Sequence, residues 1–115
     1  MNISISKTMV SQQSTRLSLL LNESEIGHAW LNVTLEDGEG GEDFKYVGVI
    51  GDVFIVDGHR SKGLGTELLR EAIEIAKEKK CKKLLALSRF ENIKAHVFYE
   101  RLGFVRHGFE FRMNF

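Results

Sequence analysis

The spacing of apolar residues along the chain changes from a two-residue period to a helical period near its middle. At the start, Ile3 and Ile5 alternate with serines, and apolar runs at 16–21 and 28–35 flank a short polar turn. Alternation of this kind is typical of half-buried strands. The first third of the chain is therefore predicted to form an early strand followed by a β-hairpin.

Further strands are predicted on both sides of an acidic turn. Residues 36–43 hold five acids and three glycines, the composition of an exposed turn. The β-branched run at 46–56 is interrupted by Gly48 and Gly51, so it predicts a strand with a bulge. A short apolar run at 84–87 predicts a covered interior strand.

Two helices are predicted in the second half of the chain. From Leu64 apolar residues recur at helical spacing, with charged residues opposite, up to the lysine-rich segment 77–83, where lysines suit the negative end of a helix dipole. Residues 92–102 predict a second helix, closed by Gly103. Residues 104–115 alternate again and predict a terminal strand.

This order of elements indicates one α/β (α+β) domain over residues 1–115. Strands come first and strand–helix–strand–helix–strand follows, which predicts a mixed, mostly antiparallel twisted sheet with two main helices packed on it. A chain of 115 residues has room for one domain, and 43% hydrophobic and 28% charged residues are ordinary for a chain that buries a core.

Charge and composition exclude several classes of partner. Sixteen basic and sixteen acidic residues give a net charge of zero, so no global field favours nucleic acid or an anionic membrane. The N-terminus lacks the basic start and apolar core of a signal peptide, and no stretch approaches the roughly 20 apolar residues of a membrane span. A cytoplasmic location is expected. Cys81 is the only cysteine, so neither an internal disulfide nor a metal site is expected.

The residues that indicate chemistry lie between the strand at 46–56 and the first helix. Residues 57–66 read DGHRSKGLGT. Glycines at a strand-to-helix junction let backbone N–H groups approach an anion, and the helix start adds partial positive charge. The segment predicts a pyrophosphate site; the alternative is an ordinary glycine turn that caps a helix.

Three pyrophosphate-binding patterns compete for this loop. A P-loop needs lysine directly after its second glycine, whereas Leu64 follows Gly63. A dinucleotide fingerprint starting at Gly63 needs glycine or alanine where Leu68 stands. The remaining pattern, R-x-x-G-x-G, is formed by Arg60, Gly63 and Gly65, and it resembles the coenzyme A pyrophosphate loop of GNAT acetyltransferases.

A second motif strengthens this resemblance. Residues 92–104 resemble the GNAT signature N-x-x-A-x-x-F-Y-x-x-x-G-F, with its asparagine, alanine, Phe-Tyr and Gly-Phe in register. The strand before the loop also matches the family. The resemblance covers about residues 46–104. It implies an N-acetyltransferase that uses acetyl-CoA and transfers the acetyl group directly to a primary amine of a protein or small molecule.

The resemblance assigns cofactor-binding residues by position. It implies that backbone groups of 53–55 contact the pantetheine arm and that amides of 61–66 hold the pyrophosphate, helped by the charges of Arg60 and Lys62. Asn92 is expected to bond the pantetheine amide, cap the second helix, or do both. The full cofactor-binding set is Val53, Phe54, Ile55, Arg60, Ser61, Lys62, Gly63, Leu64, Gly65, Thr66, Asn92 and Phe98.

Catalysis requires the acceptor amine to lose a proton, because a lysine-like amine has a pKa of about 10.4. Where the family often has glutamate or histidine, this chain has Gly51. Asp52 is the nearest carboxylate, and it is the expected base if a bulge reorients it. His28 on the facing strand is a weaker candidate. Tyr99 occupies the family's general-acid position; the alternative is a core aromatic residue.

One departure from the family concerns the N-terminus. Family members usually begin with a strand and two helices that wall the acceptor site, but here the hairpin pattern follows too soon to leave room for both. The acceptor side is therefore expected to be open or completed by another subunit, and a homodimer is expected. The missing wall and base leave open an alternative function, a coenzyme A-binding module with little or no turnover.

Overall fold

The computed structural model describes residues 2–9, 13–36, 44–60, 63–89, 91–108 and 111–115. Its strands form one five-stranded sheet in the order β1-β2-β3-β4-β5. The elements follow the chain as β1 (Ile3–Met9), β2 (Ser14–Leu21), β3 (Ser24–Glu36), β4 (Lys45–Ile55), α1 (Leu64–Glu78), β5 (Lys83–Ala86) and α2 (Ile93–Arg101).

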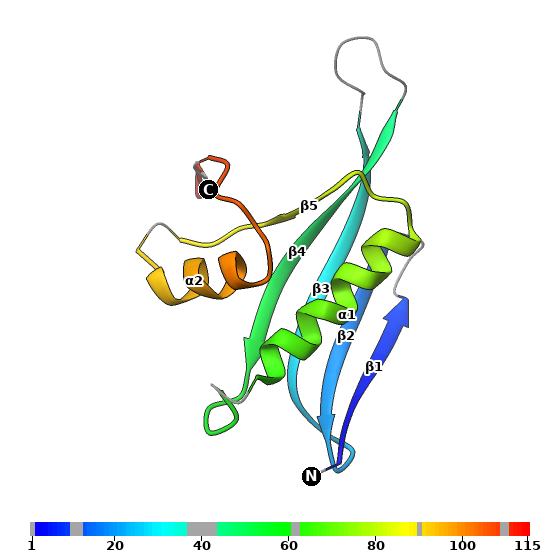
Figure 1. Ribbon diagram of the computed structural model, residues 1–115, viewed down its shortest axis with the longest axis vertical. Helices are drawn as coiled ribbons and strands as arrows, with labels where there is room; N and C mark the ends of the chain where they lie inside the picture. The colour runs from blue at the N-terminus through cyan, green and yellow to red at the C-terminus, as the bar shows by residue number, and fades with distance from the viewer. Residues whose placement is uncertain (1, 10–12, 37–43, 61–62, 90, 109–110) are drawn as a thin grey trace.

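The sheet is mixed, as predicted. β1 to β4 pair antiparallel to their neighbours, and β5 runs parallel to β4 (Figure 1). The interior position predicted for the strand at 84–87 is wrong, because β5 lies at the end of the strand order. Leu84 and Ala86 pack against the core, so burial of one face is enough to explain the apolar run.

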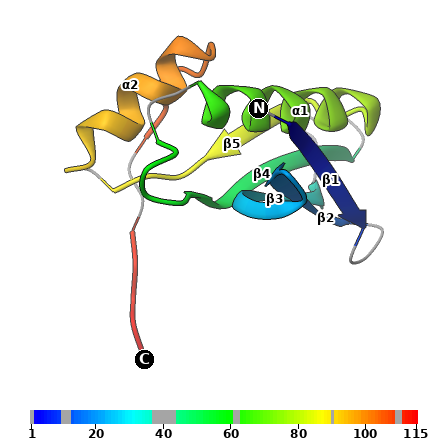
Figure 2. The same ribbon diagram turned by 90° about the horizontal axis from the view of Figure 1, so that it is seen from below.

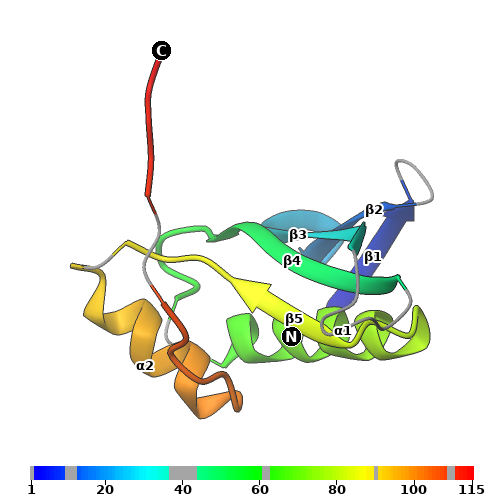
Figure 3. The same cartoon turned by 90° about the horizontal axis from the view of Figure 1, so that it is seen from above.

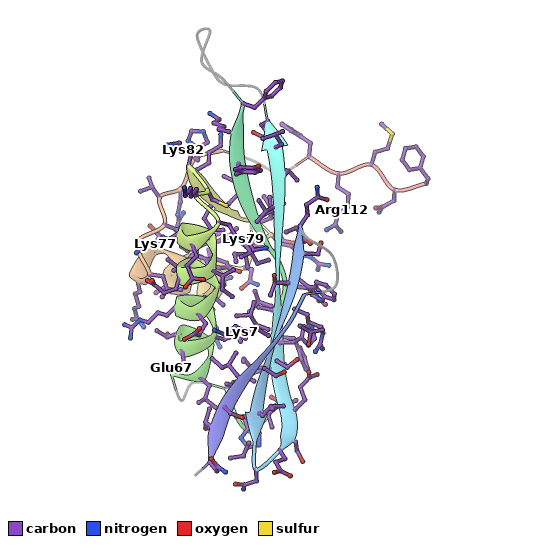
Figure 4. The ribbon with its side chains drawn as sticks, turned by 90° about the vertical axis from the view of Figure 1, so that its right-hand side faces the viewer. Lys7, Glu67, Lys77, Lys79, Lys82 and Arg112 are labelled. Atoms are coloured by element: carbon purple, nitrogen blue, oxygen red, sulfur yellow. The ribbon has the colours of Figure 1, made fainter. Side chains whose placement is uncertain are left out.

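Both helices lie on one side of the sheet (Figures 2 and 3). α1 buries the apolar stripe that its sequence predicts, including Leu68, Leu69 and Ala72, against buried strand residues such as Leu17 and Leu31. Lys77 in its last turn, Lys79 at its C-cap and Lys82 just beyond it lie at its C-terminal end (Figure 4), where positive charge stabilises the helix dipole. The opposite face of the sheet carries no helix among the described residues, and we call it the helix-free face.

The two ends of the chain give one confirmed and one wrong prediction. Within the described residues no helix precedes α1, which confirms that strands alone come before the first long helix. The terminal strand predicted at 104–115 is wrong: residues 104–108 and 111–115 form no strand, and the last segment extends away from the sheet (Figures 2 and 3). Alternation shows that a segment suits a strand, but a strand also needs a partner that pairs with it.

Two predicted features lie outside what the structure describes or concern absences. The acidic turn was predicted at 36–43. Glu36 is the last residue of β3, and residues 37–43 lie outside the described ranges. In the described part of the chain, no helix is long and apolar enough to cross a membrane.

Candidate active site

The candidate site lies where β4 and β5 separate. The two strands pair only as far as Ile50 and Ala86. β4 then continues to Ile55 beside β3, whereas the chain after β5 turns toward α2 (Figure 1). A Cβ placed on Gly65 would lie 3.5 Å from the ring of Phe98, so the start of α1 contacts α2. The end of β4, the start of α1 and α2 therefore lie close to the point where the pairing of the two strands ends.

The first turn of α1 presents backbone N–H groups without a side-chain cap. Gly63 precedes the helix with φ 77°, a left-handed conformation that favours glycine, and no side chain caps this end. The first helical bond runs from Glu67 N to Gly63 O at 3.2 Å. The amides of residues 64–66 consequently have no carbonyl partner within the helix. Together with the helix dipole, they suit a diphosphate.

The remaining loop residues divide into described and undescribed ones. Ser61 and Lys62 lie outside the described residues. Arg60 is turned onto the end of β4: its Nε donates to the carbonyl oxygen of Ile55 at 2.8 Å, and its Nη1 lies 3.4 Å from Asp57. Its guanidinium carbon lies 5.6 Å from the centre of the Phe54 ring.

A β-bulge in β4 sets the direction of the candidate base. Two β4 residues stand opposite one β3 residue between the pairs His28–Phe54 and Trp30–Gly51. Asp52 lies in this bulge with φ 51°, a left-handed conformation that costs most residues about 1–2 kcal/mol and that aspartate and asparagine tolerate better. The predicted bulge is confirmed, but its positive φ falls on Asp52 and not on a glycine.

The bulge brings the Asp52 carboxylate to His28. His28 Nε2 lies 3.0 Å from Asp52 Oδ2. An ionised carboxylate only accepts hydrogen bonds, so the imidazole donates. The Asp52 side chain is 73% exposed and that of His28 only 18%. The arrangement therefore holds one carboxylate oxygen against a largely buried ring and leaves the other accessible.

A neighbouring ion pair joins Arg16 and Glu25. Arg16 donates from Nη1 and Nη2 to the two carboxylate oxygens of Glu25, at 2.5 and 3.0 Å, and from Nη1 to Ser18 Oγ at 2.6 Å. The hydrogen bond from Arg16 lowers the pKa of Glu25 to about 2. Glu25 is the main partner of Arg16, whose charge also interacts with that of Asp52.

The candidate acid lies on α2. The Tyr99 ring packs against Phe98 and Phe104, with ring centres 5.3 and 5.4 Å away. Burial raises the pKa of the Tyr99 phenol, which keeps the proton that a general acid must carry. Tyr99 also lines a cavity of about 710 Å³ beside β5, within the range of small-ligand sites. It is the one predicted site residue in that lining.

The second motif begins with the predicted cap. The backbone N–H of Ala95 donates to Asn92 Oδ1 at 3.2 Å, which confirms Asn92 as the N-cap of α2. The carboxamide nitrogen is not used in this bond and remains available to a ligand.

The side chain of Phe54 has a position that the sequence pattern did not predict. Only its backbone was predicted to act, yet its ring lies 5.9 Å from that of His28 and is 44% exposed. Cross-strand pairing of residues 28 and 54 would have indicated the contact, but that register becomes known only with the bulge. Among the described residues, no group of three His, Cys, Asp or Glu side chains is placed to hold a metal ion.

Comparison with known proteins identifies the class. The model of the Acetyltransferase (GNAT) family matches residues 8–104. The chain therefore belongs to the GNAT acetyltransferase family.

A curated relative gives a more particular likeness. Glucosamine 6-phosphate N-acetyltransferase of Trypanosoma brucei brucei is 33% identical over 89 residues, which cover 77% of this chain and 56% of the relative. The chain thus spans little more than half the length of that protein.

Solved structures agree with the fold. A Trypanosoma brucei acetyltransferase is 28% identical with a TM-score of 0.77, covering 90% of this chain and 70% of the other. A protein described as a transcriptional regulator from Bacillus halodurans is 24% identical with a TM-score of 0.84, covering 92% and 69%. At that lower identity the likeness concerns the fold alone.

Proposed function

We propose that this protein transfers the acetyl group of acetyl-CoA to a primary amine. The observation that carries the proposal is the start of α1, which has no side-chain cap and lies where β4 and β5 separate. Arg60 and Gly63 before the helix and Gly65 in its first turn stand in family register. Membership of the acetyltransferase family supports it. A solved neighbour with the same fold, AAC(6')-Iy, is described in complex with coenzyme A.

Coenzyme A is proposed to bind where β4 and β5 separate. The amides of residues 63–66 hold its diphosphate, and the backbone of Val53, Phe54 and Ile55 meets the pantetheine arm where β5 no longer pairs with β4. Asn92 offers its carboxamide nitrogen to the arm, and Phe98 packs beside Gly65. The thioester is thereby directed toward the space between Asp52 and α2.

The proposed chemical step is direct attack. Asp52 accepts a proton from the acceptor ammonium, itself or through one water, and His28 holds the carboxylate in place. The neutral amine attacks the thioester carbonyl, and a backbone N–H of β4 stabilises the oxyanion. The carbon–sulfur bond breaks as Tyr99 protonates the leaving thiolate. The amine nitrogen then gives its remaining extra proton, through water, to the Tyr99 phenolate, which restores the phenol.

Release of free thiol from acetyl-CoA in the presence of an amine panel tests this function. Glucosamine 6-phosphate enters the panel first because the T. brucei relative is named for it, followed by lysine-containing peptides and polyamines. Amine-dependent release supports the proposal. Coenzyme A binding without thiol release for any amine would favour the second candidate function, a binding module with little turnover. The presence of Gly51 at the position where the family often has its base supports that second candidate.

Asp52→Asn is expected to lower kcat by about 10²-fold or more, the usual contribution of a general base. Asparagine tolerates the left-handed conformation of residue 52, so the bulge and the thermal unfolding midpoint should be kept. Steady-state kinetics measure the effect. Glu74→Gln, on the exposed side of α1, removes the same charge and should leave turnover unchanged. Equal turnover in the Asp52 variant would remove this carboxylate from the mechanism.

We also propose that the protein is a homodimer, because no helix covers the helix-free face among the described residues. A dimeric mass in sedimentation equilibrium at micromolar concentration is the expected result. A monomeric mass at that concentration contradicts it.

A further inference from the structure

Three groups stand in a row on the helix-free face at the end of β4. The Asp52 carboxylate is hydrogen-bonded to His28. The centre of the Phe54 ring lies 5.9 Å from that of the His28 ring and 5.6 Å from the guanidinium carbon of Arg60. The row thus consists of a proton acceptor, an exposed apolar platform and a cation. The Phe54 ring lies beside both the His28 ring that holds Asp52 and the Arg60 guanidinium, so it links the proton acceptor to the cation.

Of the two arginines near this row, Arg60 is the one with N–H groups left to donate to a ligand. Arg16 is committed to Glu25 and Ser18, and its side chain is only 28% exposed. The Arg60 side chain is 55% exposed, and one hydrogen bond from Nε to Ile55 O fixes it over Phe54. In the described part of the chain its Nη2 has no partner. A guanidinium placed in advance loses less entropy when it binds an anion by two parallel hydrogen bonds.

Among the described residues, Asp57 is the group that competes for this fork. Its carboxylate lies 3.4 Å from Arg60 Nη1, and its side chain is 94% exposed. Ion pairs between such exposed groups contribute little to stability. A bound anion therefore displaces Asp57 at small cost.

We propose that the acceptor is a compact amine that carries its own anionic group, a phosphate or a carboxylate. Its ammonium meets Asp52, its carbon skeleton lies on Phe54, and its anion binds Arg60. This inference rests on the proposed acetyl transfer and adds the chemical class of the acceptor. It also gives the Arg60 side chain a role distinct from the pyrophosphate contact that family position implies.

Matched acceptor pairs test the proposal. Glucosamine 6-phosphate is compared with glucosamine, and γ-aminobutyrate with its amide, so that each pair differs only in the anion and the two pairs separate phosphate from carboxylate. The wild-type protein should prefer the anionic member of at least one pair by about tenfold or more in kcat/KM, as a charge-assisted hydrogen bond provides. Arg60→Gln should reduce that preference about tenfold, and Arg60→Lys should restore part of it.

Arg70→Gln, which removes an exposed arginine from α1, is the matched control and should keep the wild-type preference. If Arg60→Gln instead raises KM for acetyl-CoA with both members of a pair and leaves their ratio unchanged, Arg60 binds the pyrophosphate and the proposal is wrong. An absent preference in the wild-type protein also overturns it.

Binding measurements separate this proposal from the proposed function. Calorimetry with the same pairs is run on the protein with and without coenzyme A. Tighter binding of the anionic member that is lost in Arg60→Gln supports the acceptor class, even if no thiol is released. Absence of thiol release would then contradict only the proposed acetyl transfer. Equal binding of both members overturns the acceptor class even if other amines are acetylated.

Discussion

Gly65→Glu is expected to weaken coenzyme A binding by at least 100-fold. The added carboxylate would stand in the first turn of α1, among the amides of residues 63–66 that we propose for the diphosphate. Two like charges about 4 Å apart repel by roughly 4 kcal/mol at the effective dielectric near a protein surface, and each 1.4 kcal/mol is a factor of about ten in affinity. Calorimetric titration with coenzyme A measures the loss.

The fold should survive this substitution. A Cβ at Gly65 would meet the Phe98 ring at 3.5 Å, an ordinary van der Waals contact, and an acidic residue in the first turn favours the helix dipole. An unchanged unfolding midpoint is the control for folding. Gly65→Gln adds the same bulk without the charge and should lose less affinity. Retained affinity in Gly65→Glu would place the diphosphate elsewhere.

Tyr99→Phe is expected to lower kcat by about 10²-fold or more, while KM for acetyl-CoA changes little. The loss follows because a positioned general acid contributes about 10²–10⁴-fold. Burial already raises the pKa of this phenol, so the hydroxyl holds its proton at neutral pH and gives it up when the thiolate leaves. The ring itself is kept, so the contacts with Phe98 and Phe104 should persist.

Tyr46→Phe is the matched control for the phenol. Tyr46 lies near the opposite end of β4 and is 49% exposed, so its hydroxyl should not affect turnover. Single-turnover kinetics with the best amine of the panel compare the two variants. A Tyr99 variant that turns over like the control would leave Tyr99 as a packing residue of α2.

Much of the fold was predictable because local pattern and burial agree. The stripe from Leu64 to Ala76 is apolar at helical spacing and is buried as α1, and Asn92 caps the helix that its sequence predicts. The predictions failed where a strand's neighbours matter. The run at 84–87 became an edge strand, and the alternating residues 104–108 and 111–115 found no pairing partner.

The parts of the candidate site that consist of residues at fixed sequence spacings were predictable. The parts that depend on how one strand is registered against another were not. The loop glycines and the Phe98-Tyr99 pair stand at fixed spacings, so their elements could be predicted. The contact between His28 and Asp52 needs a bulge that shifts one strand against another. The position of Arg60 over Phe54 needs a loop conformation. Neither is encoded in a residue spacing.

An amide-resolved NMR titration shows whether the start of α1 holds the diphosphate of coenzyme A. Coenzyme A and pantetheine, which lacks the diphosphate, are added separately to the ¹⁵N-labelled protein. The amides of residues 63–66 are expected to shift strongly with coenzyme A and little with pantetheine, whereas those of 53–55 should shift with both. Amides at 63–66 that stay unmoved at saturating coenzyme A would contradict this placement of the diphosphate.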